Sequence, residues 1–90
     1  YGAGNNGRLL AQRFKSDAAL NVNLIGFVDD DPKKQALNIG GVLVLGSRDD
    51  LKSLIEKYQI GQIIIAAADM PGEVLRDIVH IARPYNIRPR

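Results

Sequence analysis

The sequence predicts an α/β fold in which a parallel sheet is packed between helices. Residues 22–28 (VNLIGFV) and 62–67 (QIIIAA) are nearly continuous apolar runs, as strands covered on both faces require. Segments with the helical spacing of apolar residues lie before, between and after these runs. A glycine-rich loop precedes the first helical segment. Strands that alternate with helices along a chain form parallel sheets, so these observations give the fold class.

The first half of the chain is predicted to hold one helix and two strands. The helix should run from about residue 6 to residue 14 or 15, because apolar residues recur there at intervals of three and four. Strand 22–28 ends at three aspartates, and residues 33–38 form a loop or one helical turn. Gly40 and Gly41 interrupt the chain before a short strand at residues 42–45.

The second half is predicted to hold two helices around the most apolar strand. Ser47 should cap a helix that presents an apolar face as far as Tyr58. The strand at residues 62–67 follows, and a turn leads into a helix over residues 72–82. We expect another strand to start at Ile87, after the proline that stops the last helix.

The loop at the start of the chain has the form G-x-G-x-x-G. Such a loop normally follows the central strand of a Rossmann-like, doubly wound parallel sheet with helices on both faces. Only Tyr1 is left of that first strand, which is missing from the given chain. We expect apolar residues before Tyr1 in the native protein, and an unfilled position between strands 22–28 and 62–67. Hydrogen bonds that join these two strands directly would contradict the prediction.

Size and composition limit the function classes. Ninety residues suffice for one domain, and we expect residues 1–90 to be a single nucleotide-binding domain, a fragment of a larger protein. A net charge of +2 with dispersed basic residues argues against nucleic-acid binding. No apolar run is long enough to span a bilayer, so we expect no membrane contact by this domain. The absence of cysteine excludes thiolate metal sites and fits a cytoplasmic location, at the inner membrane if the parent protein is anchored there.

The three glycines of the loop suit the binding of a diphosphate. Gly2 permits the tight turn, Gly4 lets the backbone approach a pyrophosphate, and Gly7 lets the helix pack closely. The N-terminus of the helix adds unpaired N–H groups and the positive end of the helix dipole. Asn5 and Asn6 either line the phosphate site or cap the helix.

An acidic residue at the end of the next strand makes the predicted ligand more specific. Asp29 lies 22 residues after Gly7, where a carboxylate accepts hydrogen bonds from an adenosine ribose and disfavours a 2′-phosphate. The sequence thus predicts a dinucleotide, NAD rather than NADP. The alternative is an ordinary turn followed by a solvated loop of Asp29, Asp30 and Asp31. Small residues around Ala67 either leave room for the second half of the ligand or serve tight packing.

No residue of the chain is a strong catalytic candidate. His80, the only histidine, lies on the polar face of its predicted helix. No tyrosine is followed four positions later by the lysine that short-chain dehydrogenases use, and no metal-ligand spacing is visible. We therefore expect any catalytic residues of the parent protein to lie outside this chain.

Four segments carry a family resemblance: GAGNNGRLL (2–10), IGFVDDDPKK (25–34), IGGVLVLGSRDDLKSLIEKY (39–58) and QIIIAAA (62–68). They resemble the nucleotide-binding domain of bacterial polysaccharide-biosynthesis proteins, the nucleotide-sugar dehydratases, epimerases and dehydrogenases. The resemblance implies an NAD(P)-binding Rossmann-like domain whose parent enzyme transfers hydride at a sugar carbon.

The resemblance also implies roles for individual residues. It assigns the diphosphate to Gly2, Gly4, Asn5, Asn6 and Gly7, and the ribose to Asp29 and Asp30. At Ala67-Ala68-Asp69 the sequence departs from the family, which usually has a proline after the alanine of the strand, and this leaves the far half of the site open.

Two related layouts keep a second function class open. The N-terminal domains of sugar O-acetyltransferases and redox-sensing repressors share the arrangement of glycines and aspartates. The alternative is therefore a non-catalytic sensor or regulatory module that binds a nucleotide, a nucleotide-sugar or coenzyme A. The oligomeric state, including a homo-oligomer, is left open by the sequence.

Overall fold

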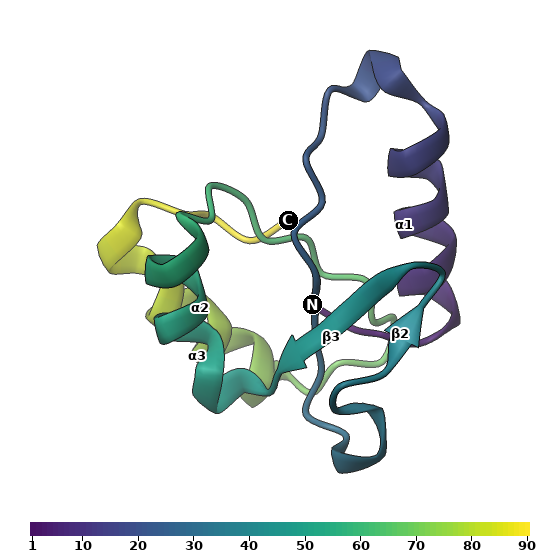
Figure 1. Cartoon of the computed structure of the whole chain (residues 1–90). Helices are drawn as coiled ribbons and strands as arrows, with labels where there is room; N and C mark the ends of the chain where they lie inside the picture. Colours follow the sequence, from purple (N-terminus) through teal and green to yellow (C-terminus); the bar gives the residue numbers. More distant parts are fainter.

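A computed structural model describes residues 1–90 and confirms the α/β class. The helices are α1 (Asn5–Ser16), α2 (Leu51–Tyr58) and α3 (Gly72–Ala82), and the strands are β1 (Phe27–Val28), β2 (Asn38–Ile39) and β3 (Val42–Gly46). Helix α1 lies on one side of β3, and α2 and α3 lie together on the other (Figure 1). The predicted helices are thus confirmed in position and type.

The three strands form a mixed sheet, so the prediction of a wholly parallel sheet is wrong. Their order is β1-β3-β2, with β1 parallel and β2 antiparallel to β3. Gly40 and Gly41 have φ values of 61° and 87°, and they close a two-residue hairpin turn between β2 and β3. Two consecutive residues with positive φ are what such a turn requires. The glycine pair therefore reverses the chain rather than merely interrupting it.

Helix α2 begins after one turn of 3-10 helix, at the position predicted from Ser47. The backbone N–H of Ser47 donates to Oδ2 of Asp50 at 2.9 Å, and the Ser47 hydroxyl lies 3.4 Å from the same oxygen. Ser47 and Asp50 thus bind each other at the start of the helix.

Two predicted strands are shorter in the structure than in the sequence pattern. Of residues 22–28 only Phe27 and Val28 are a strand, and residues 62–67 form none. Residues 22–26 take part in no backbone hydrogen bond. An extended segment counts as a strand only when a neighbour pairs with it, and here the neighbour is absent along most of the length.

The backbone of Tyr1 and Gly2 occupies the position between these two segments. The amine of Tyr1 donates to the carbonyl oxygen of Ile64, and the N–H of Ala66 donates to the carbonyl oxygen of Tyr1 at 2.8 Å. On the other side, Gly2 N–H donates to the carbonyl oxygen of Val28 at 2.8 Å. No hydrogen bond joins residues 22–28 directly to residues 62–67, so the pairing that would have contradicted the prediction is not found. The complete doubly wound sheet stays a prediction.

The C-terminal residue Arg90 pairs with the segment 63–65. Arg90 N–H donates to the carbonyl oxygen of Ile63 at 3.0 Å, and Ile65 N–H donates to the carbonyl oxygen of Arg90 at 2.6 Å. The pairing is too short to be a strand, but it lies where the sequence predicts one.

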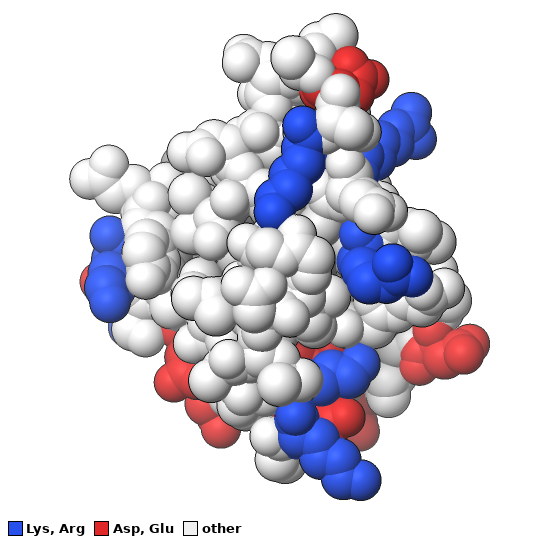
Figure 2. Space-filling view, turned by 45° about the vertical axis from the view of Figure 1, so that its right-hand side comes forward, with Lys and Arg blue, Asp and Glu red and all other residues white.

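The buried apolar side chains form two separate clusters. The cluster around α2 and α3 contains Leu51, Ile55, Ile63, Ile78, Ala82 and Ile87. The cluster beside α1 contains Ala3, Ala11, Phe27, Val42 and Val44. On the face that Figure 2 shows, basic and acidic side chains are interspersed around a broad uncharged area. None of the helices combines the length and the apolar composition that crossing a bilayer requires.

Candidate functional site

The glycine-rich loop is held closely against its neighbours. Gly2 has a φ of 108°, a backbone conformation that residues with a side chain rarely adopt. A Cβ there would lie 3.3 Å from Cβ of Ala67. A Cβ at Gly7 would overlap the carbonyl oxygen of Gly2. The loop therefore rests on Ala67 and closes on itself at Gly7, so both glycines are required by the geometry.

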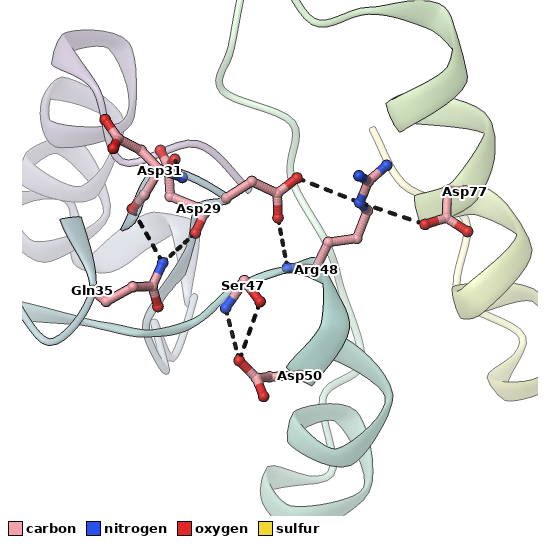
Figure 3. A network of polar contacts seen from close by, with 8 residues as sticks. Asp29, Asp31, Gln35, Ser47, Arg48, Asp50 and Asp77 are labelled. Carbon is pink, nitrogen blue, oxygen red and sulfur yellow. Dashed lines mark hydrogen bonds and ion pairs between the residues drawn. The ribbon is translucent and has the colours of Figure 1, made fainter. Parts of the chain in front are cut away.

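The carboxylate of Asp29 fixes the loop to the end of β1. Its Oδ2 accepts the backbone N–H of Ala3 at 2.8 Å, and its Oδ1 accepts the backbone N–H of Asp31 at 2.9 Å. The side-chain amide of Gln35 donates to the carbonyl oxygen of Asp29 from the other direction (Figure 3). Asp29 thus lies at the loop, as predicted, but both of its oxygens already serve the protein backbone.

The N-terminus of α1 is open to an anion. Gly4 is the N-cap residue, no side chain caps the helix, and the first turn holds no acidic residue. The first N–H groups of a helix have no partner within it and carry the positive end of its dipole. Asn5 and Asn6 lie exposed in the first turn, where Asn5 Oδ1 accepts a hydrogen bond from Arg8 at 2.9 Å. Neither asparagine caps the helix, because the helix begins at Asn5 itself.

Lys34 places a positive charge beside the loop, and the sequence alone did not single it out. Its Nζ donates to the carbonyl oxygen of Ala3 at 3.4 Å and would lie 3.7 Å from a Cβ at Gly4. The ammonium group takes part in no ion pair, since both ion pairs of the protein belong to Arg48. The neighbouring Lys33 is exposed. A half-buried cation at the open end of a helix adds to the attraction for a phosphate.

Asp30 is directed away from the loop by Arg48. The backbone N–H of Arg48 donates to Oδ1 of Asp30 at 2.7 Å, and Nε of Arg48 lies 3.3 Å from Oδ2. The same Nε lies 3.4 Å from Oδ2 of Asp77 on α3, so Arg48 bridges two elements (Figure 3). The structure therefore places Asp30 in a network that joins the loop after β1, the 3-10 turn before α2, and α3.

A polar hollow of about 490 Å³ opens beside this network. Its lining consists of Asp30, Pro32, Gln35, Ser47, Arg48, Asp49 and Asp50. Three carboxylates face a single guanidinium here, so the hollow repels phosphates more than it attracts them. The loop differs from this hollow, because the ammonium group of Lys34 lies beside it.

The side chain of Tyr1 lies near Asp30 and Arg48, two residues of the same network. Its hydroxyl is buried and makes no hydrogen bond of normal geometry. Burial first, and the neighbouring carboxylate of Asp30 next, raise the pKa of this hydroxyl well above its usual value. The hydroxyl therefore stays neutral at physiological pH.

The structure brings together most of the residues predicted from the sequence. Gly2, Gly4, Gly7, Asp29 and Ala67 converge on one loop, with Asn5 and Asn6 at its outer edge. Asp30 points to Arg48 instead. His80 is exposed on α3, away from the loop, and no three potential metal-ligating side chains converge.

Comparisons with known proteins identify the family of the chain. Residues 1–88 match a family described as a CoA-binding domain. A curated protein of Bacillus subtilis (strain 168), "Probable polysaccharide biosynthesis protein EpsC", is 34% identical over 65 residues. That alignment covers 72% of this chain and 11% of the Bacillus protein, so the chain corresponds to a small part of its relative. No solved structure is significantly similar to the chain.

Proposed function

Because the chain belongs to the CoA-binding domain family, we propose that it binds coenzyme A through the glycine-rich loop and the N-terminus of α1. The observation that carries the proposal is the uncapped, acid-free first turn of α1, which begins at Gly4. Gly4 has open space above it, because a Cβ there would meet only the flexible end of Lys34. A diphosphate can approach the backbone at such a position.

The charge distribution supports coenzyme A in particular. Coenzyme A carries a phosphate on its ribose in addition to its diphosphate, and Lys34 is an unpaired cation beside the loop. NAD would be favoured by a carboxylate that accepts hydrogen bonds from the ribose hydroxyls, and Asp29 is the residue at that position. Its two oxygens each accept a backbone N–H, however, and are thus already in use. NAD remains the second candidate, because Asp29 still stands at the end of β1 next to the loop, as dinucleotide-binding loops require.

We place this binding in surface-polysaccharide biosynthesis, following the Bacillus relative. The chain covers 11% of that protein. The reaction of the parent protein, including hydride transfer on a nucleotide-sugar, is therefore assigned to the remainder of the polypeptide. In this proposal the domain binds its ligand without catalytic residues of its own.

Isothermal titration calorimetry with coenzyme A, dephospho-coenzyme A, NAD and NADP tests the proposal. We expect coenzyme A to bind most tightly. Gly4→Ala should weaken its binding by about tenfold or more, since the new methyl group occupies the path of the diphosphate. Gly61→Ala is the matched control, because a Cβ at Gly61 meets nothing within 4 Å. Wild-type affinity in Gly4→Ala, or no binding of any of the four ligands, would contradict the proposal.

A further inference from the structure

The turn after β1 determines which of two adjacent lysines faces the glycine-rich loop. Residues Pro32–Lys34 form a single turn of 3-10 helix. In such a helix successive side chains are about 120° apart, so Lys33 and Lys34 point in different directions. Lys33 is exposed, whereas Nζ of Lys34 donates to the carbonyl oxygen of Ala3 at 3.4 Å. The orientation of this turn therefore selects the lysine that lies at the loop.

One end of the turn is fixed by the carboxylate of Asp29. Its Oδ1 accepts the N–H of Asp31 at 2.9 Å. Within the turn, the N–H of Lys34 donates to the carbonyl oxygen of Asp31, and the N–H of Lys33 donates to Oδ1 of Asp31, both at 3.0 Å. These last two bonds lie inside residues 31–34 and move with them. They give the turn its shape, and its orientation depends on what holds the other end.

Gln35 holds that other end. It directly follows Lys34 and is half-buried. Its Nε2 donates to the carbonyl oxygen of Asp29 and, at 3.3 Å, to the carbonyl oxygen of Asp31 (Figure 3). A side-chain amide nitrogen carries two N–H groups, so this one nitrogen can serve both oxygens. The amide thereby ties the end of the turn to the residues at its beginning.

The backbone after Gln35 is strained, which indicates that the segment is held by its contacts. Ala36 has a φ of 62°, a conformation that residues with a side chain rarely adopt. Its N–H donates to the carbonyl oxygen of Val44 on β3 at 3.2 Å. Such strain persists only where the surrounding structure holds the chain firmly. When the amide of Gln35 is removed, Ala36 can relax, and the 3-10 turn can rotate with it.

We propose that Gln35 is a positioning residue of the ligand site, whose side-chain amide orients the 3-10 turn so that Lys34, and not Lys33, lies at the glycine-rich loop. Gln35 acts through Lys34. Its effect on affinity rests on the proposed binding of coenzyme A, whereas its effect on the position of Lys34 does not. The two effects are therefore measured separately.

The first test asks whether Gln35 makes the two lysines different. Gln35→Met is the variant, because methionine has a similar length and no N–H donor in its side chain. Gln12→Met makes the same exchange at an exposed position of α1 and is the matched control. Calorimetry with coenzyme A is carried out on Lys34→Ala and Lys33→Ala, each in the wild-type, Gln35→Met and Gln12→Met backgrounds.

With wild-type Gln35, Lys34→Ala should weaken binding of coenzyme A about tenfold more than Lys33→Ala does. In the Gln35→Met background this ratio should fall to about twofold or less, because the two lysines then share the position at the loop. The Gln12→Met background should keep the wild-type ratio. A ratio that Gln35→Met leaves unchanged would overturn the proposal and reduce Gln35 to a contribution to stability. If Gln35→Met does not fold, Gln35→Asn replaces it, because its amide is one methylene too short to reach both carbonyl oxygens.

Nuclear Overhauser effects in the unliganded chain test the position of Lys34 without any ligand. Nζ of Lys34 would lie 3.7 Å from a Cβ at Gly4, so the ε-methylene protons of Lys34 should show such effects to the α-protons of Gly4. They should disappear in Gln35→Met and remain in Gln12→Met. The same effects in wild type and Gln35→Met would overturn the proposal, even where coenzyme A binds. Their loss in Gln35→Met, together with no binding of coenzyme A to the wild type, would support the role of Gln35 and contradict the proposed function alone.

Discussion

Oδ2 of Asp29 accepts the backbone N–H of Ala3 at 2.8 Å, so one carboxylate connects the glycine-rich loop to the end of β1. The other oxygen, Oδ1, accepts the N–H of Asp31 at 2.9 Å. In a dinucleotide site this acid would be expected to bind the ribose. In this protein the carboxylate of Asp29 accepts hydrogen bonds from backbone N–H groups, and these bonds hold the loop in its conformation.

Asp29→Asn should lower the free energy of unfolding by about 1–3 kcal/mol, because the amide nitrogen of asparagine cannot accept one of the two N–H groups. Affinity for coenzyme A, NAD and NADP should fall by similar factors, since the loop itself is disturbed. Urea unfolding and calorimetry measure the two effects. Asp49→Asn is the control, because Asp49 is exposed and makes no hydrogen bond through its side chain. Unchanged stability with a selective loss of NAD binding would instead assign Asp29 to the ribose.

Gly7→Ala should destabilise the protein by about 1–3 kcal/mol, in contrast to Gly4→Ala. A Cβ at Gly7 overlaps the carbonyl oxygen of Gly2 and lies 3.2 Å from Cε1 of Phe27, so loop and helix must move apart. A Cβ at Gly4 meets no such obstacle, and Gly4→Ala should keep the wild-type Tm within about 3 °C. Thermal unfolding followed by circular dichroism distinguishes the two. Equal Tm values for both variants would show that the loop is looser than the structure indicates.

The helices and the loop were predictable because their signals are local. The apolar face of α1 and the glycines at positions 2, 4 and 7 are set by residues close in sequence. The hairpin of β2 and β3 was less predictable, since Gly40 and Gly41 indicate a turn without saying which strands pair. Residues 22–26 and 62–67 have strand composition, yet they pair only where a neighbour is present. Strand formation there depends on a partner that no local pattern specifies.

The candidate site was predictable to the same extent. The glycines and Asp29 follow a motif with fixed spacing, so the sequence placed them together. Lys34 and Arg48 follow no motif, and their roles depend on how the turn after β1 folds back on the loop. The run of three aspartates before Pro32 was a signal for that turn, but a turn alone does not say which of the two adjacent lysines faces the loop.

Lys34→Ala should weaken binding of coenzyme A by about tenfold, the usual effect of one charge-assisted hydrogen bond. Lys33→Ala should change it little, because Lys33 is exposed while Lys34 Nζ donates to the carbonyl oxygen of Ala3 at 3.4 Å. Both variants remove one positive charge, so the difference between their affinities for coenzyme A reports the effect of where the lysine lies. Calorimetry with coenzyme A and dephospho-coenzyme A shows which phosphate is bound. A similar loss of affinity in both variants would contradict a specific contact with Lys34 and would indicate a general effect of positive charge.

The stability of the 90-residue chain should rise between about pH 6 and about pH 8 because of the amine of Tyr1. Burial lowers the pKa of this amine from 8.0 to about 6, although the carboxylate of Asp29 opposes the shift. Between these two values the unfolded chain binds more protons than the folded chain, so the free energy of unfolding increases with pH. The penalty is fully present below the folded pKa and is absent above the unfolded one, and it amounts to at most about 3 kcal/mol. Urea unfolding across this range measures it, and acetylation of the amine should remove the part of the slope that Tyr1 causes. A slope that acetylation leaves unchanged would assign the pH dependence to another group and would place the Tyr1 amine in water.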